Sequence, residues 1–180
     1  MTTMVPAWVD GTLTPVEKLA VHQRGLRHRA VSVFVMHGDQ TLIQQRALGK
    51  YHTPGLWANT CCTHPNWGED PADCAARRLR EELGIGGLSL RLAGQTEYRA
   101  EVGCGLIEHE VVDLFVAEAP LDLPLALNPD EVMDTEWVGL DALSRQAKTV
   151  PERFTPWLRI YLNEGWGKAA QTLMLDAARI

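Results

Sequence analysis

The pattern of apolar and polar positions predicts several β-strands. Residues 29–47, "RAVSVFVMHGDQTLIQQRA", contain two apolar runs on either side of the turn "HGDQ", which is typical of two paired strands. Residues 88–103 and 105–119 are typical of two strands joined by a glycine-rich turn. Residues 131–143, "EVMDTEWVGLDAL", indicate a strand that leads into a helix. A β-sheet is therefore the centre of the predicted fold.

The clearest helical pattern covers residues 69–85, "EDPADCAARRLREELGI". Asp70 can cap this helix, Pro71 suits its first turn, and Gly84 can end it. Its apolar residues recur at helical spacing and form one stripe: Ala72, Ala75, Ala76, Leu79 and Leu83. We therefore expect this helix to pack on the sheet.

Helical segments are also predicted nearer the two ends of the chain. In residues 14–25, Thr14 can cap a short helix, Pro15 suits its first turn, and Gly25 can stop it. Residues 154–175 also have helical character. Strands interspersed with helices predict an α/β (α+β) fold, in which a mixed sheet is sandwiched between helices.

Composition narrows the class of protein. The 180 residues are enough for one domain with a real core, and the hydrophobic fraction of 46% is ordinary for a globular chain. A net charge of −6 argues against a nucleic-acid partner, which would need clustered Lys and Arg. The N-terminus lacks the pattern of a signal peptide, and no apolar run approaches the ~20 residues that span a bilayer. We expect a cytoplasmic monomer without membrane contact.

The segment "NTCCTHP" places two cysteines side by side, with a histidine two positions after the second. If the segment is extended, Cys62 and His64 share one face and Cys61 lies on the other. Free cysteine is among the most buried residue types, so core packing is the better interpretation for Cys61, Cys74 and Cys104. For Cys62, packing and chemistry are about equally supported.

Paired carboxylates occur in "LIEHEVV", where Glu108 and Glu110 point to one face of an apolar strand and His109 to the other. Two such carboxylates repel each other and cost desolvation free energy, and a cation would relieve both costs. Taken alone, the motif slightly favours a solvent-facing edge strand. Together with His22 and His28 of "HQRGLRH", it suits a divalent metal ion in a mixed nitrogen and oxygen shell.

Charged residues crowd the segment "RRLREELG" at the end of the predicted central helix. Its acids can bind magnesium and its arginines can bind phosphate. Further cations are available at Lys18, Arg46 and Lys50. The alternative is a solvated face with pairs such as Arg77–Glu81 and Arg78–Glu82, worth only ~0.2–0.5 kcal/mol each.

Taken together, "GLWANTCCTHP", "RRLREELG" and "EYRAEVGCGLIEHEV" resemble the type I isopentenyl-diphosphate Δ-isomerases, a family with the Nudix fold. The resemblance covers about residues 5–160 in order and spacing. It implies one Nudix-like domain over 1–180 with a core at about 28–145. It also implies that the N-terminal segment supplies metal ligands and that the helices at 154–175 close the pocket.

The segment around the central helix resembles a degenerate Nudix box, G-x5-E-x7-R-E-U-x-E-E-x-G-U, where U is a bulky aliphatic residue. The box is matched at Glu69, Arg77, Glu81, Glu82, Gly84 and Ile85. Thr63 stands at its first glycine, where the isomerase family has a small residue. Arg78 replaces a carboxylate that belongs to the hydrolytic metal cluster, as in the isomerases. This replacement argues against pyrophosphate hydrolysis and for holding a diphosphate intact.

The resemblance implies a role for each matching residue. The catalytic residues would be Cys62, Glu110 and Tyr98, with Tyr98 hydrogen-bonded to that glutamate. A divalent metal (Mn, Zn or Mg) would be held by His22, His28, His64, Glu108 and Glu110. Glu82 would hold the magnesium ion that accompanies the substrate diphosphate. The substrate would be bound by Lys18, Arg46, Lys50 and Arg78, with Trp157 beside its hydrocarbon.

The implied reaction interconverts isopentenyl diphosphate and dimethylallyl diphosphate in isoprenoid biosynthesis, without flavin, through a tertiary carbocation. Such a reaction needs an acid and a base across the alkene and a dry pocket. The π face of Trp157 would stabilise the cation by ~2 kcal/mol or more. Whether Cys62 acts as thiolate base or thiol acid depends on direction and local field, and we assign it as the base in the forward direction.

Two other functions are compatible with parts of the sequence. A Nudix hydrolase of a nucleoside diphosphate derivative would use the central helix, but Arg78 and the pairing of Cys62 with Glu110 disfavour it. A non-catalytic metal-binding domain would explain the histidines and glutamates. It gives no reason for Cys62, Tyr98 and Trp157 to accompany them.

Overall fold

The computed structural model describes residues 3–177. The strands are β1 (Met4–Val9), β2 (Thr12–Glu17), β3 (Arg27–His37), β4 (Gln40–Arg46), β5 (Trp57–Ala58), β6 (Cys61–Thr63), β7 (Arg91–Glu101), β8 (Ile107–Glu118) and β9 (Val132–Gly139). The helices are α1 (Lys18–Arg24), α2 (Pro71–Leu83), α3 (Leu140–Thr149), α4 (Pro156–Glu164) and α5 (Trp166–Ala177), with a short 3-10 helix, η1 (Pro151–Arg153).

Strand β3 is the hub of the mixed sheet. It runs parallel to β8, from Arg27 opposite His109 to Met36 opposite Glu118, and β8 continues antiparallel to β7. It also pairs antiparallel with β6 and with β4, and β4 pairs with β5 and β9. The β1–β2 hairpin joins β3 at its start. Because β3 and β7 flank β8, the strand that carries the paired glutamates lies inside the sheet.

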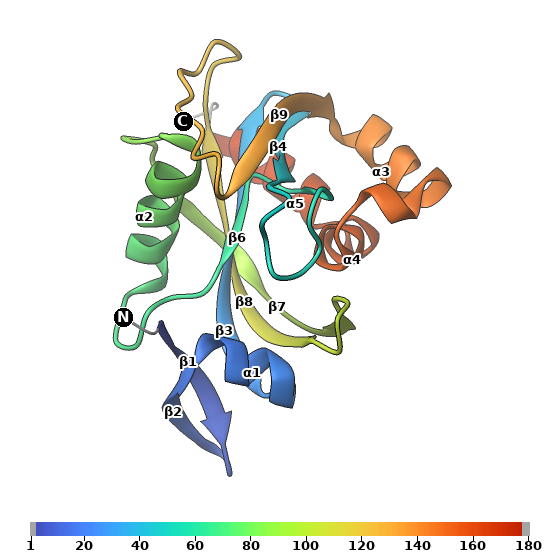
Figure 1. Ribbon diagram of the computed structural model, residues 1–180. Coiled ribbons are helices and arrows are strands. Elements are labelled where there is room, and N and C mark those ends of the chain that lie inside the picture. The colour runs from blue at the N-terminus through green and yellow to red at the C-terminus, as the bar shows by residue number, and fades with distance from the viewer. Residues whose placement is uncertain (1–2, 178–180) are drawn as a thin grey trace.

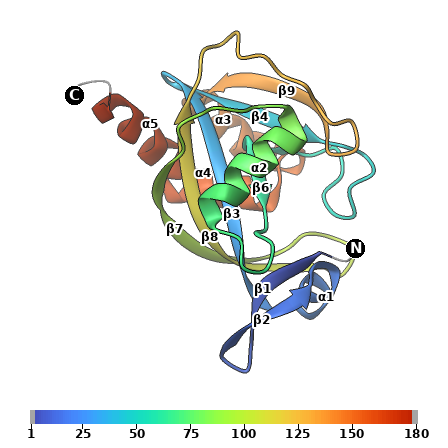
Figure 2. The same ribbon diagram turned by 90° about the vertical axis from the view of Figure 1, so that its left-hand side faces the viewer.

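Helices cover both faces of the sheet, as the sequence predicts. In Figure 1 the sheet stands between α2 on one side and α3, α4 and α5 on the other. Alternate residues of β3 serve the two layers: Val33 packs in the core beneath α2, and Phe34 packs in the core beneath α4 and α5. Figure 2 shows α2 lying across the sheet, with β1, β2 and α1 gathered at one end.

Helix α2 has the caps that the sequence predicts. The Asp70 carboxylate accepts a hydrogen bond of 2.8 Å from the Ala72 amide, and Pro71 occupies the first turn. Gly84 ends the helix with φ of 71°, a left-handed conformation that glycine adopts at little cost. The strands predicted within 29–47, 88–103 and 105–119 are also confirmed.

The helix predicted over residues 14–25 is wrong in its first half. Thr14 and Pro15 belong to β2, which pairs with β1, and the helix begins only at Lys18. The cap is Glu17, whose carboxylate accepts hydrogen bonds of 3.1 Å and 2.8 Å from the amides of Leu19 and Ala20. The local pattern could not reveal this, because antiparallel pairing with β1 holds Thr14 and Pro15 extended.

Residues 154–175 are helical as expected, and Gly165, which has φ of 83°, divides them into α4 and α5. One expectation about the cysteines is wrong. Cys104 is exposed in the turn between β7 and β8, whereas Cys61 and Cys74 are buried as expected. The turn holds Cys104 at a φ of 54° and leaves it outside the core. Within residues 3–177, no helix has both the length and the apolar character needed to cross a membrane.

Candidate active site

Strand β6 separates the two adjacent cysteines onto opposite faces of the sheet. It pairs antiparallel with β3, so that Cys61 lies opposite Val33 and Cys62 opposite Ser32. Cys61 is fully buried in the core beneath α2, whereas Cys62 lines a polar pocket on the other face. The alternation predicted from the sequence is confirmed, and Cys62 shares that pocket with His64.

Two hydroxyl groups surround the Cys62 thiol. Its Sγ lies 3.3 Å from the Ser32 Oγ and 3.6 Å from the Tyr161 hydroxyl oxygen. Burial, followed by the negative charge of Glu110, raises the pKa of the thiol above its ordinary value. Cys62 is therefore protonated at neutral pH in the ligand-free protein.

Strand β8 buries two carboxylates in the same pocket. Glu108 and Glu110 are each 3% exposed, and the hydroxyl of Tyr98 on β7 lies 2.8 Å from an oxygen of each. His109, between them, faces the other way and lies 3.1 Å from Glu97. The interpretation of this segment as a solvent-facing edge strand is wrong, because the chain buries β8 between two neighbouring strands.

One phenol proton must serve these two carboxylates. Tyr98 can donate to only one of Glu108 and Glu110 at a time. Burial, followed by the charge of Glu110, raises the pKa of Glu108 well above its usual range. Burial also opposes the charge on Glu110, but His64 and His28 outweigh it and hold the pKa of Glu110 well below its usual range. The ligand-free pair therefore keeps a proton on Glu108 and the negative charge on Glu110.

Three histidines from separate elements converge on Glu110. His22 comes from α1, His28 from β3, and His64 follows β6. The His64 Nε2 lies 2.9 Å from the Glu110 Oε1 and 3.1 Å from the His28 Nε2, which is 3.6 Å from the same oxygen. One ligand atom from each of the four residues lies within 4.8 Å of the others. The fold thus assembles four of the five predicted metal ligands.

The orientation of these histidines fits a divalent metal ion. The Nδ1 atoms of His22 and His28 lie 2.7 Å from backbone carbonyls, to which they must donate, so each Nε2 keeps its lone pair. The His22 Nε2 is buried without a hydrogen-bond partner among residues 3–177. A metal with bonds of about 2.1 Å separates neighbouring ligand atoms by about 3 Å. The nitrogen and oxygen atoms around Glu110 have comparable separations.

Glu108, the fifth predicted ligand, belongs to a second group that shares His22. Its carboxylate clusters with His22 and His52, all three of them buried. Burial, followed by the charge of Arg46, lowers the pKa of His52 to about 2, so the ring is neutral. The sequence pattern does not single out His52, because it lies in the loop between β4 and β5. No periodicity assigns a loop side chain to a face.

The other end of the pocket is cationic. Its lining includes every residue predicted to bind substrate, namely Lys18, Arg46, Lys50, Arg78 and Trp157, together with Glu82 and the catalytic candidates Cys62, Tyr98 and Glu110. Burial, followed by the charges of Lys50 and Arg78, lowers the pKa of Lys18 to about 8. Like charges gathered in a partly buried cleft favour the binding of an anion. The predicted ligands His22 and His28 are fully buried.

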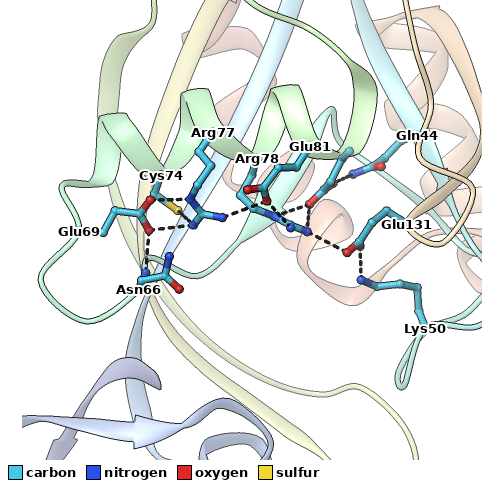
Figure 3. A network of polar contacts seen from close by, with 10 residues as sticks. Gln44, Lys50, Asn66, Glu69, Cys74, Arg77, Arg78, Glu81 and Glu131 are labelled. Atoms are coloured by element: carbon cyan, nitrogen blue, oxygen red, sulfur yellow. Dashed lines mark hydrogen bonds and ion pairs between the residues drawn. The ribbon is translucent and has the colours of Figure 1, made fainter. Parts of the chain in front are cut away.

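Arg78 is the centre of an ionic network on α2 (Figure 3). Its guanidinium lies 2.6 Å from Glu82, 2.8 Å from Glu81 and 3.2 Å from Glu131, and Glu131 also pairs with Lys50. The expected Arg78–Glu82 pair is therefore present, but it is part of a partly buried cluster and not a solvated face. The sequence analysis missed Glu131, which precedes β9 and reaches the cluster only through tertiary structure.

Trp157 already has a cation beside it. The Arg46 guanidinium carbon lies 5.2 Å from the centre of the indole ring, and the side chain of Trp157 is almost completely buried. A guanidinium at this distance is attracted by the negative π face of the ring. The indole thus contacts both the cationic end of the pocket and the core beneath α4.

The fold and the degenerate box define the class of this protein, a NUDIX-domain protein. Residues 26–158 match the NUDIX domain family. The crystal structure of DR0079 from Deinococcus radiodurans has a TM-score of 0.72 with 15% sequence identity, covering 89% of this chain and 98% of its own. A MutT NUDIX hydrolase from Burkholderia pseudomallei has a TM-score of 0.59 with 22% identity, covering 76% and 96%. These two likenesses establish the fold alone.

Sequence relatives define the family more narrowly. The chain is 72% identical over 162 residues to an isopentenyl-diphosphate Delta-isomerase of Cereibacter sphaeroides, covering 90% of this chain and 92% of that one. It is 64% identical to the isopentenyl-diphosphate Delta-isomerase of Rhodobacter capsulatus, covering 89% and 92%. The chain belongs to the isopentenyl-diphosphate Delta-isomerase family, within the NUDIX class.

Proposed function

We propose that the protein interconverts isopentenyl diphosphate and dimethylallyl diphosphate by adding a proton at one face of the alkene and removing one from the other. The observation that carries this proposal is the entry of Cys62 and Glu110 into one pocket from β6 and β8, which lie on either side of β3. Cys62 lies opposite Ser32 and Glu110 opposite His28, so the two backbones are offset by about 10 Å across the sheet and about 13 Å along it. That separation leaves room for a five-carbon group between the side chains.

The two groups exchange roles with the direction of reaction. In the forward direction, Glu110, assisted by Tyr98, delivers a proton to C4 and Cys62 removes one from C2. In the reverse direction, the Cys62 thiol donates and Glu110 accepts. The ligand-free protein, with its thiol protonated and Glu110 charged, has the protonation states of the reverse direction. The tertiary carbocation between the two steps is protected by a pocket lined with buried side chains, which exclude water.

The diphosphate anchors the substrate at the cationic end of the pocket. Lys18, Arg46, Lys50 and Arg78 neutralise its charge, and Glu82 would hold an accompanying magnesium ion, which would neutralise more of it. This binding free energy is available to position an alkene that offers the protein no polar group of its own. Trp157, at the boundary between the two ends, faces the hydrocarbon and stabilises the developing cation.

A divalent ion, Mn, Zn or Mg, fits the chamber of His22, His28, His64, Glu108 and Glu110, where it would supply fixed positive charge beside the carboxylates. The chain's own contribution is orientation. Tyr98 fixes the two carboxylates, and the carbonyls of Lys18 and Leu26 fix two of the imidazole rings. A pyrophosphate hydrolase is disfavoured, because Arg78 stands where such enzymes place a carboxylate.

One assay tests this proposal. Purified protein is incubated with isopentenyl diphosphate in deuterated water, with magnesium and with manganese or zinc. Incorporation of deuterium into dimethylallyl diphosphate is the expected result. Release of phosphate without isomerisation would establish hydrolysis instead, and metal binding without turnover would favour a binding protein.

The two adjacent cysteines provide a matched pair of variants. Cys62→Ala is expected to lower turnover below detection, because it removes one of the two proton-transfer groups. Cys61→Ala is expected to keep most of the turnover and to cost about 1 kcal/mol of stability through the loss of buried volume. Comparable losses of turnover in two equally folded variants would show that the face assignment does not determine function.

The proposal also covers the cellular location, the oligomeric state and the binding partners of the enzyme. We infer a cytoplasmic monomer that takes a small diphosphate substrate and no nucleic acid. The net charge of −6 supports the last point, because a nucleic-acid partner favours a basic protein. Size-exclusion chromatography with light scattering tests the oligomeric state.

A further inference from the structure

The loop between β4 and β5 carries a buried imidazole for which the proposed reaction has no role. His52 is 5% exposed, and the Arg46 Nη2 donates a hydrogen bond of 3.1 Å to its carbonyl oxygen. The next residue, Thr53, has φ of 46°, a conformation that is costly for a β-branched side chain. Strain of this kind persists where the surroundings fix a side chain, and it is common at functional sites.

The ring of His52 turns its free nitrogen toward the carboxylates. Its Nδ1 lies 3.1 Å from the Thr53 hydroxyl oxygen, and its Nε2 lies 3.7 Å from the Glu108 Oε1. The second separation is too long for a hydrogen bond. Tyr51 and Trp157 hold the plane of the ring through edge contacts, with centroids 4.4 Å and 5.9 Å away.

His22, which belongs to the same group as His52 and Glu108, carries an unpartnered nitrogen. The His22 Nε2 has no hydrogen-bond partner within residues 3–177, and its Nδ1 is already bonded to the Lys18 carbonyl. Ligand atoms of His22, His52 and Glu108 lie within 4.8 Å of one another. The group thus places two imidazole nitrogens and one carboxylate oxygen close together without hydrogen bonds between them. A divalent transition metal prefers this set of donor atoms.

We propose that His52 is an additional ligand of the metal centre, bound on the Glu108 side of the chamber. The inference rests on the proposed metal site of His22, His28, His64, Glu108 and Glu110. With His52, the two groups that share His22 would together offer six protein donors, the number in an octahedral shell. A filled shell leaves no position for a bound water. The proposed metal centre orients carboxylates beside a carbocation, and a metal-bound water there would attack that carbocation as a nucleophile. A filled shell therefore suits this centre.

Cobalt(II) tests coordination directly, because a histidine bound to this paramagnetic ion gives a strongly shifted exchangeable imidazole N–H signal in proton NMR. In the cobalt-loaded protein, we expect such signals from His22, His28, His64 and His52. His52→Gln, which preserves approximate size and polarity, should remove one of them. His37→Gln is the matched control, since His37 is exposed at the end of β3, away from the metal site, with its Nδ1 3.0 Å from the Ala119 carbonyl oxygen. It should remove none.

Metal affinity gives a second readout that requires no turnover. Competition of the zinc- or manganese-loaded protein with a chelating dye should show binding at least about 10–100-fold weaker in His52→Gln, because even the loss of an outer-shell partner of a metal ligand costs that much affinity. His37→Gln should stay within about twofold of the unaltered protein. Melting curves of the metal-free proteins check that both variants fold.

The possible outcomes distinguish the role of His52 from the existence of the metal site itself. An unchanged signal set and affinity in a folded His52→Gln would overturn the role of His52 while leaving the proposed isomerase and its five ligands intact. If the unaltered protein binds no divalent ion, the metal site itself fails, and the inference fails with it. Should His52→Gln not fold, the unaltered cobalt protein still decides, because the absence of a signal assignable to His52 contradicts the proposal.

Discussion

At the scale of single residues, burial determines which side chains hold charge in this pocket. Glu110 remains ionised because two histidines face it, whereas its neighbour Glu108 favours its proton. The same environment leaves Cys62 as a thiol and lowers the pKa of Lys18 to about 8. The protonated Glu108 departs from the ordinary state of a carboxyl group in water, whereas Glu110, Cys62 and Lys18 keep their ordinary states at neutral pH with shifted pKa values. Each shift results from a position in the fold that charge counting along the sequence does not reveal.

The lowered pKa of Lys18 predicts a pH dependence for anion binding. Lys18 is charged below about pH 8 and loses its proton as the pH rises above that value, so its attraction for a diphosphate fades over the same range. Titration calorimetry with inorganic pyrophosphate should therefore show affinity falling above pH 8, relative to Lys18→Gln measured in parallel. The variant corrects for ionisation of pyrophosphate itself. Parallel pH profiles in the two proteins would rule out this role for Lys18.

At the scale of elements, the end of α2 links the ionic network to the long connection before β9. The amides of Ala126 and Asn128 donate to the carbonyls of Leu83 and Glu82, at 2.8 Å and 2.9 Å. A methyl group built on Gly84 would lie 2.6 Å from the Ala126 Cβ, closer than such atoms approach in proteins. Gly84 is thus required both by its left-handed conformation and by the close passage of this connection.

This contact predicts a large effect of Gly84→Ala. The substitution combines positive-φ strain of about 1 kcal/mol with a clash against backbone, so we expect a loss of about 2–3 kcal/mol in the free energy of unfolding. Gly87→Ala is the matched control, because its φ of 75° is similar and no atom lies within 4 Å of the added carbon. It should lose about 1 kcal/mol. Urea denaturation measures both, and equal losses would show that the approach of Ala126 is unimportant.

The elements also show how far the sequence could predict this fold. Local signals predicted α2, through Asp70 and Gly84, because caps and periodicity act within one element. The β3–β4 pair was predictable for the same reason. The strand that contains Thr14 and Pro15 was not, because its partner β1 determines its conformation. His52 and Glu131 were missed because connections without periodicity carry them to the site, and only tertiary structure brings them near the residues that the resemblance identified.

At the scale of the whole molecule, the metal chamber brings side chains of the N-terminal segment together with side chains of the central sheet. Helix α1 and the β1–β2 hairpin lie at one end of the sheet and have a small core of their own, made of Val5, Ala7 and Val21 (Figure 1). His22 extends from α1 into the group that includes Glu110 of β8. A metal ion held there would link the N-terminal segment to the central sheet, so binding and folding should be coupled.

This coupling predicts that metal removal weakens the N-terminal segment before the rest of the fold. At a free metal concentration about 100 times the dissociation constant, binding to the native state adds about 2.7 kcal/mol. For a chain of this size that corresponds to a rise in Tm of about 5–10 °C. Chelation should reverse the rise and speed hydrogen exchange in α1 more than in β3, because the small N-terminal core alone must then hold His22 in place. His22→Ala, which lacks the connecting ligand, should show little response of α1 to metal. A uniform change of exchange across the sheet and α1 would instead indicate that the ion stabilises the molecule as one unit.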